Sequence, residues 1–264
     1  MTNVVRKVVR NQLRDAVRSR WLAVYSLFFA LLSDGLLRFS GSDAKAILSL
    51  TTVVLIVIPL VTLVLSTIYV YNAREFTELL LAQPIRRLSL FAGLYLGLTL
   101  PLAGGFVAGV SLPFLVRGGG DPAQQGALLT LLAIGVVLTA VFTAIAFWIA
   151  LRAEDRLRGL GIALGVWMAM GLLYDGAVLV VVAIFADYPI ERPLLALSFA
   201  NPIDLGRMLM LLRLDVAALM GYTGAVFQRF FAGSSGIALA SAALAGWVVI
   251  PLAFGARTFR RKDF

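Results

Sequence analysis

The sequence predicts an all-α polytopic membrane protein. Of its 264 residues, 61% are hydrophobic and 14% are charged, whereas a soluble domain is nearer half apolar and a quarter charged. The apolar residues also form long blocks rather than a surface pattern. Only helices and closed barrels satisfy their backbone hydrogen bonds in lipid, and these blocks are too long for barrel strands. We therefore expect a bundle of membrane-spanning helices.

Six apolar runs are long enough to cross a membrane. They cover residues 21–39, 47–71, 89–116, 127–151, 159–186 and 236–256. Pro59 is expected to interrupt the second, and the third exceeds the ~20 residues that a crossing needs, which predicts tilt or a kink. Residues 117–126 are expected to form a turn-rich loop. No repeat divides the chain, so we expect residues 1–264 to form a single transmembrane domain.

The distribution of basic residues predicts the orientation. Most of the 23 Lys and Arg residues lie in residues 1–20, in 72–88, in 152–158 and after the last span. An excess of Lys and Arg marks the cytoplasmic side, so both termini are predicted to be cytoplasmic, in an inner membrane. Residues 1–20 have helical apolar spacing and are expected to form a basic interfacial helix among anionic lipids. An ordinary topology-fixing flank is the alternative, and neither needs nucleic acid as a partner.

The chain lacks the residues of several chemistries. It has no cysteine and no histidine, which excludes disulfides, thiolate chemistry and the usual zinc sites. It has no GxxxxGK[ST] motif and thus no P-loop. We expect no catalytic residue, metal or cofactor here; ATP and Mg would be bound by a separate subunit. Packing is the favoured role of the five methionines that could also be soft copper(I) ligands. These are Met168, Met170, Met208, Met210 and Met220.

A short charged segment between the second and third spans is the main candidate site. Residues 72–88 read NAREFTELLLAQPIRRL, which predicts a short helix ended by Pro84. Such a helix could seat in the groove of a motor protein, and a solvated connector is the alternative. The candidate docking residues are Arg74, Glu75, Glu78, Leu79, Leu80, Pro84 and Arg86.

The stretch ELLLAQPIRR, residues 78–87, resembles the coupling-helix motif of ABC-2 type permeases. That resemblance implies the type V exporter fold: six spans, an N-terminal interfacial helix and cytoplasmic termini. It also implies a homodimer and a cytoplasmic ABC ATPase as partner. Many family members carry a glycine before a Thr-Leu-Glu in this motif, where this chain has Glu75 and Phe76.

A narrower resemblance is to the NosY group of these permeases. It is carried by LLYDG (172–176), NPIDLGRMLMLL (201–212) and LDVAALMGYTGAVF (214–227). This group serves nitrous oxide reductase maturation. The resemblance implies NosF-like ATPases, an extracytoplasmic NosD-like protein and, through it, a copper chaperone and the reductase. Export of a sulfur species and conformational control of the copper-delivery partner both stay open.

Residues 187–235 are expected to be extracytoplasmic and to include an external amphipathic helix. Asn201 is placed as its N-cap and Pro202 as its first residue. Charged residues within it argue against a seventh crossing, so it should rest on the membrane or on the bundle. Its candidate contacts with an external partner are Asn201, Asp204, Arg207, Arg213, Asp215 and Tyr222.

Three further charges fall within the spans. Asp34 and Arg38 are four residues apart and share a helix face, and Asp175 lies in the fifth span. Because intramembrane charges usually pair, we expect Arg38 to bridge Asp34 and Asp175. Separate snorkelling to the interface is the alternative. Gly105 and Gly109, like two other glycine pairs, permit close helix approach, either within one subunit or at a dimer seam.

Two other functional classes remain as alternatives. A stand-alone ion-coupled secondary transporter would show inverted repeats and ionisable residues near the midplane, and neither is evident. An intramembrane enzyme would need a nucleophile and base, for which only serine is available. The sequence therefore favours the membrane subunit of an ATP-driven transporter.

Overall fold

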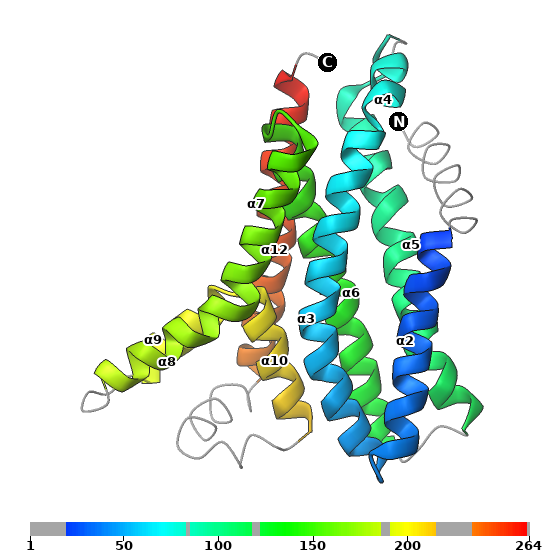
Figure 1. Cartoon of the computed structure of the whole chain (residues 1–264). Helices are drawn as coiled ribbons and strands as arrows, with labels where there is room; N and C mark the ends of the chain where they lie inside the picture. The colour runs from blue at the N-terminus through cyan, green and yellow to red at the C-terminus, as the bar shows by residue number, and fades with distance from the viewer. Residues whose placement is uncertain (1–19, 83–84, 118–121, 186–190, 215–233, 263–264) are drawn as a thin grey trace.

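The computed structural model describes residues 20–82, 85–117, 122–185, 191–214 and 234–262. Within these ranges every element is a helix, and the long helices run side by side as a bundle (Figure 1). The predicted interfacial helix of residues 1–20 lies almost wholly outside the described residues. So do Pro84, Asp215 and Tyr222 of the candidate sites.

Six helical spans in the described residues are long and apolar enough to cross a membrane, which confirms the predicted architecture. They are α2 (Arg20–Phe39), α3 (Asp43–Asn72), α5 (Arg87–Val116), α6 (Pro122–Arg152), the continuous run α7–η1–α8 (Arg156–Met168, Ala169–Leu173, Tyr174–Ile184) and α12 (Ser234–Arg261). Most extend beyond the predicted bounds because polar flanking residues continue or cap the helix. Ser42, for example, accepts a hydrogen bond from the Lys45 amide at 3.4 Å and caps α3.

Two boundary predictions were wrong. Pro59 does not interrupt the second span, since α3 is one helix on both sides of it. Residues 122–126 are not loop but the first turn of α6, which starts at Pro122. A proline fits the first turn of a helix because the amide it lacks would have no intrahelical partner there. Within a bundle, neighbouring helices help to accommodate an internal proline such as Pro59.

The core of the bundle is centred on α6. This helix packs against α3, α5, α7, α10 and α12, while α2 packs mainly on α5. Phe29 of α2 and Phe106 of α5 are fully buried and meet edge to face, with ring centroids 5.2 Å apart. Gly109 permits this approach, because a Cβ there would lie 2.5 Å from the Ser26 carbonyl oxygen. The Gly105–Gly109 pair therefore packs helices within one subunit.

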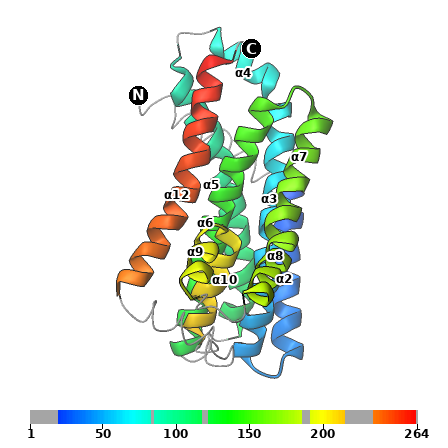
Figure 2. The ribbon, with the colours of Figure 1, turned by 90° about the vertical axis from the view of Figure 1, so that its left-hand side faces the viewer.

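Two short helices, α9 (Glu191–Phe199) and α10 (Pro202–Arg213), follow the fifth span. They lie at the end of the bundle away from the short helix α4 (Arg74–Leu81), in front of α6 in Figure 2. As predicted, Asn201 caps α10 and Pro202 begins it. Ile203, Leu205 and Met210 are fully or almost fully buried. Because α10 packs on α3, α6 and α12, it rests on the bundle rather than on the membrane surface.

Candidate functional site

The predicted coupling segment forms the helix α4, residues Arg74–Leu81, at the same end of the bundle as the end of α12 (Figure 1). It follows α3 directly, with Ala73 serving both as the C-cap of α3 and as the N-cap of α4. The Thr77 hydroxyl donates to the Ala73 carbonyl at 2.7 Å. Thr77 is buried, whereas Leu79 on the opposite side is 71% exposed. The helix thus has an inner and an outer face.

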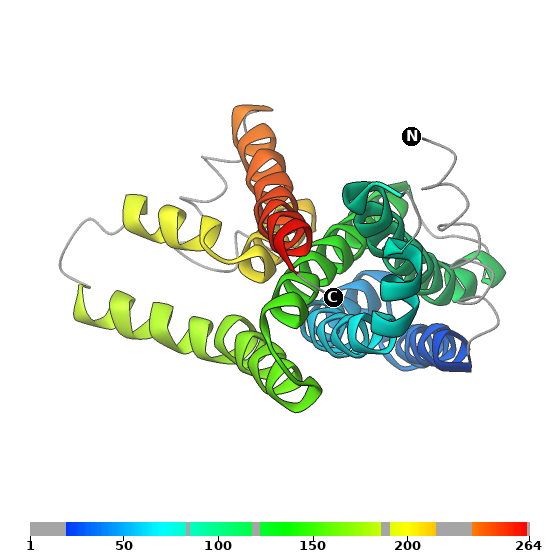
Figure 3. The ribbon, with the colours of Figure 1, turned by 90° about the horizontal axis from the view of Figure 1, so that it is seen from above.

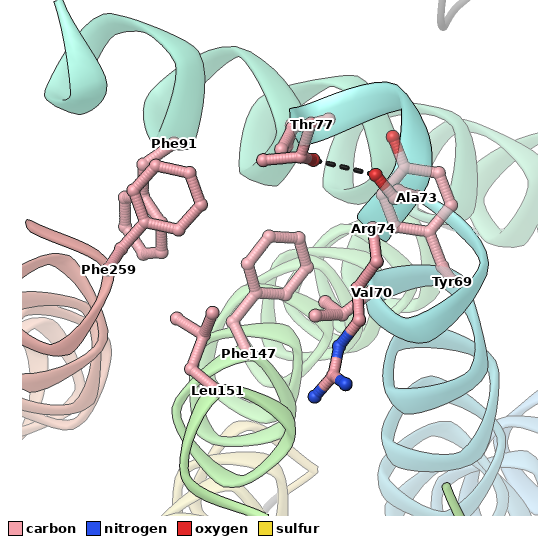
Figure 4. Close-up of a pocket in the computed structure, with 10 residues that line it drawn as sticks. Tyr69, Val70, Ala73, Arg74, Thr77, Phe91, Phe147, Leu151 and Phe259 are labelled. Atoms are coloured by element: carbon pink, nitrogen blue, oxygen red, sulfur yellow. Dashed lines mark hydrogen bonds between the residues drawn. The ribbon is translucent and has the colours of Figure 1, made fainter. Parts of the chain in front are cut away.

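The inner face of α4 rests on an aromatic cluster formed by three other helices. Phe147 of α6 has its ring centroid 5.9 Å from that of Phe91 on α5, and Phe91 lies 5.5 Å from Phe259 on α12. Leu80 and Leu81 pack against the same cluster. A cavity of about 20 Å³ remains beneath α4 (Figure 4), which is room for about one water molecule.

The carboxyl end of α6 is capped by side chains from the other helices at this end. Arg74 donates to the carbonyls of Ala153 and Glu154, both at 3.4 Å, and the Tyr71 hydroxyl donates to Ala153 at 3.3 Å. Lys262 donates to the Leu151 carbonyl at 2.8 Å. Terminal helix carbonyls lack intrahelical partners and attract cations. These contacts therefore tie α4, α6 and the chain end after α12 together, and we call them the α6 clamp.

Charge is concentrated at the α6 clamp. The Arg74 guanidinium lies 4.7 Å from the centroid of the Tyr71 ring, a cation–π geometry. Burial lowers the pKa of Lys262, and the nearby positive charge of Arg74 lowers that pKa further. Arg87 of α5 donates to the carbonyls of Arg260 and Lys262 at 3.0 and 2.9 Å, which fixes the end of α12 against α5.

The structure divides the predicted docking residues between the two faces. Glu75, Glu78 and Leu79 are exposed on the outer face, where a partner could reach them. Arg74 and Leu80 lie on the inner side, in the α6 clamp and the aromatic cluster, so the structure gives them a holding role.

One outer-face residue escaped the sequence reasoning, and one predicted docking residue lies beyond the helix. Arg86 is exposed at the N-cap of α5. Phe76 is 44% exposed and was missed. Its place three residues before Leu79 on one helix face was the available signal.

A second cluster joins α10 to the fifth span. The Arg207 guanidinium lies 2.8 Å from the Asp175 carboxylate on α8 and 3.6 Å from that of Asp204. The Asn201 side chain accepts from the Ile203 amide at 3.0 Å and donates to the Met170 carbonyl at 2.7 Å. We call these contacts the α10 anchor. These contacts hold the short helix α10, which is not one of the six spans, against the fifth span.

The π-helical turn η1 lies at the α10 anchor. It covers Ala169–Leu173, and a π turn carries one more residue than an α turn, often at functional sites. Met170 within it supplies the carbonyl that Asn201 contacts. Next to it, the Tyr174 hydroxyl donates to the Leu197 carbonyl of α9. The Trp247 indole of α12 donates to the Phe199 carbonyl at 3.1 Å, so both adjoining spans hold the α9–α10 pair.

The predicted bridge from Arg38 to Asp175 is wrong. Arg38 does pair with Asp34, at 2.8 Å, and Asp34 also contacts Arg117 of α5 at 2.8 Å. Asp175 instead pairs with Arg207. In Figure 3, α2 (blue) and α8 (yellow-green) lie on opposite sides of the bundle. Sequence position placed these charges within the spans but could not show the direction in which each side chain faces.

The predicted external contacts also divide. Asn201 and Asp204 are 1% and 7% exposed, so they hold α10 in the bundle rather than face a partner. Arg207 is occupied by its two carboxylates. Arg213 is exposed at the end of α10, and of the described candidates it remains the one open to a partner.

Comparison with known proteins assigns the family. A family profile described as ABC-2 family transporter protein matches residues 6–264. The chain belongs to the ABC-2 family of transporter permeases. A protein of Pseudomonas aeruginosa named "Probable ABC transporter permease protein NosY" is 31% identical over 98% of both chains. A protein of the same name from Stutzerimonas stutzeri is 28% identical over 78% of this chain and 81% of its own.

An ABC-2 permease is one subunit of an ABC transporter, so the family places this chain among transporter permeases rather than stand-alone secondary transporters. Permease subunits of this kind are generally not enzymes themselves. Three of the candidate methionines that the structure describes are packed: Met210 is fully buried in the core, and Met170 and Met208 lie against buried clusters. Met168 is 48% exposed.

Proposed function

We propose that this NosY-like permease passes the motion of a separate, NosF-like ATPase from one side of the membrane to a protein on the other. The observation that carries the proposal is the two-faced helix α4. Its outer face offers Glu75, Phe76, Glu78 and Leu79 to a partner, while its inner face is fixed to the bundle. A partner that binds the exposed face of α4 could therefore move the bundle, because the other face of α4 is attached to it.

The contacts of α6 supply a route for that motion. The α6 clamp attaches α4 to the end of α6, and α6 packs along its length on α3, α5 and α12 and on α10. The α10 anchor then links α10 to the fifth span. Displacement of α4 would thus reach α10 through one rigid helix. Under this proposal the protein lies in an inner membrane. The end of the bundle that carries α4 is cytoplasmic, as are both chain termini, and the helices α9 and α10 are extracytoplasmic.

The remaining partners follow from the NosY resemblance. We propose a homodimer with two ATPase subunits, which bind ATP and Mg, and a NosD-like protein on the α10 side. That NosD-like protein would in turn bind a copper chaperone and nitrous oxide reductase. The transporter would use ATP hydrolysis either to export a sulfur species or to control the conformation of the copper-delivery partner.

Charge reversal on the outer face of α4 tests the docking step. Glu78→Arg should abolish co-purification of the ATPase while the permease still inserts into the membrane, because only the exposed surface changes. Glu154→Arg is the matched control, since the Glu154 side chain is 87% accessible on the neighbouring loop and only the backbone carbonyl of Glu154 takes part in the α6 clamp. Full retention of the ATPase by Glu78→Arg would refute docking on α4.

A further inference from the structure

A wide apolar groove runs between α6, α7 and α12, from Arg152 near the α4 end of the bundle to Met170 of η1 and Phe199 of α9. Its volume is about 760 Å³, within the ~300–1,000 Å³ of typical small-molecule sites. The walls carry side chains such as Ile149, Val166, Trp247 and Ile250. Of the described residues that line the groove, only Arg152 is charged. In Figure 2, α6 lies between α12 and α7, the two other helices that line the groove.

Two arginines mark one end of the groove. The Arg152 guanidinium lies 5.3 Å from the centroid of the Trp148 ring, and that of Arg257 lies 6.0 Å from the Phe254 ring. These two rings line the groove and stack on each other, with centroids 5.5 Å apart. Both arginines are exposed, and neither forms an ion pair within the described residues. The groove therefore combines a long apolar wall with two unneutralised cations at one end.

We propose that this groove binds one anionic phospholipid. An acyl chain would lie along the wall formed by α6, α7 and α12, and the phosphate would lie between Arg152 and Arg257. Guanidinium groups bind phosphate oxygens with strong, charge-assisted hydrogen bonds. Arg152 ends α6, so the cations lie at the end of a membrane span, where lipid headgroups are found. The site is independent of the transport role proposed above.

Native mass spectrometry of the full chain in detergent, titrated with phosphatidylglycerol and separately with phosphatidylcholine, tests the assignment. We expect tighter retention of phosphatidylglycerol, and about a fivefold loss of affinity for each of Arg152→Gln and Arg257→Gln. Arg156→Gln is the matched control, because Arg156 is an exposed arginine at the start of α7 that does not line the groove. Equal retention of phosphatidylglycerol by all four proteins would overturn the proposal.

A second pair of variants tests the groove without changing its charge. Gly246 lines the groove, and a Cβ there would meet nothing within 4 Å, so Gly246→Leu should fill the groove and displace the lipid without unfolding the chain. Gly161 has the same free space outside the groove, and Gly161→Leu should keep the lipid. If Gly246→Leu instead changes the oligomeric state and leaves lipid retention intact, a second copy covers the groove and the lipid site is refuted.

Discussion

Arg207 of α10 lies 2.8 Å from Asp175 of α8, and this pair joins the short helix after the fifth span to the span itself. Both side chains are about one-third exposed, and Arg207 also lies 3.6 Å from the more deeply buried Asp204. Removing Arg207 would therefore leave two carboxylates facing each other without a cation. The α10 anchor thus depends on one guanidinium.

Arg207→Ala should lower the free energy of unfolding by about 1–2 kcal/mol, between the values for exposed and buried ion pairs. Asp175→Ala should cost less, because Arg207 keeps Asp204. Thermal unfolding in detergent measures both. The charge-swapped double variant Asp175→Arg with Arg207→Asp should recover less than full stability, since the swapped aspartate faces Asp204. Full stability of Arg207→Ala would show that the pair does not anchor α10.

Two variants of Asn201 separate its two hydrogen bonds. Asn201→Asp keeps an acceptor for the Ile203 amide but loses the donor to the Met170 carbonyl. Asn201→Ala loses both and should cost about 1–2 kcal/mol as a lost helix cap. We expect protease sensitivity after α9 to rise in the order wild type, Asn201→Asp, Asn201→Ala. Equal sensitivity of the two variants would mean that the contact with η1 contributes nothing.

Arg74→Ala tests whether the α6 clamp transmits motion rather than binds the ATPase. Because Arg74 faces inward to Ala153 and Glu154, the variant should co-purify the ATPase normally. It should lose about 1 kcal/mol of stability from the lost hydrogen bonds and reduce transporter-stimulated ATP hydrolysis. Arg156→Ala, on an exposed side chain, is the control. If Arg74→Ala no longer binds the ATPase, Arg74 takes part in docking, and its role in the α6 clamp alone is refuted.

Gly109 and Gly104 offer a matched test of the packing of α2 on α5. A Cβ at Gly109 would lie 2.5 Å from the Ser26 carbonyl oxygen, whereas a Cβ at Gly104 would meet nothing within 4 Å. Gly109→Ala should destabilise the protein by about 1–3 kcal/mol through overpacking. Gly104→Ala should be neutral or stabilise it by up to ~1 kcal/mol, since alanine favours the helix. If Gly109→Ala and Gly104→Ala have the same melting temperature, the close packing of α2 on α5 at Gly109 is refuted.

The features that the sequence predicted are those that depend on local chemistry. The six spans followed from the length of the apolar runs, and the start of α10 followed from Asn201 and Pro202, which act within one helical turn. The pairing of Arg38 with Asp34 is likewise a contact within one helix.

The features it missed depend on how helices turn toward one another. Whether Asp175 meets Arg38 or Arg207 depends on how the fifth span and α10 pack, which no single segment encodes. The inward position of Arg74 and Leu80 depends on the α6 end and the aromatic cluster, which come from distant parts of the chain. The groove between α6, α7 and α12 had no sequence signal at all.

The π-helical turn η1 also sets the rotational phase of the fifth span. Its extra residue rotates everything that follows by about 100° relative to an uninterrupted α-helix. A chain one residue shorter within Ala169–Leu173 would form a regular α-helix that still turns Asp175 toward Arg207, whereas a regular α-helix of the full length would turn Asp175 away. The π turn therefore decides which residue of the fifth span faces α10.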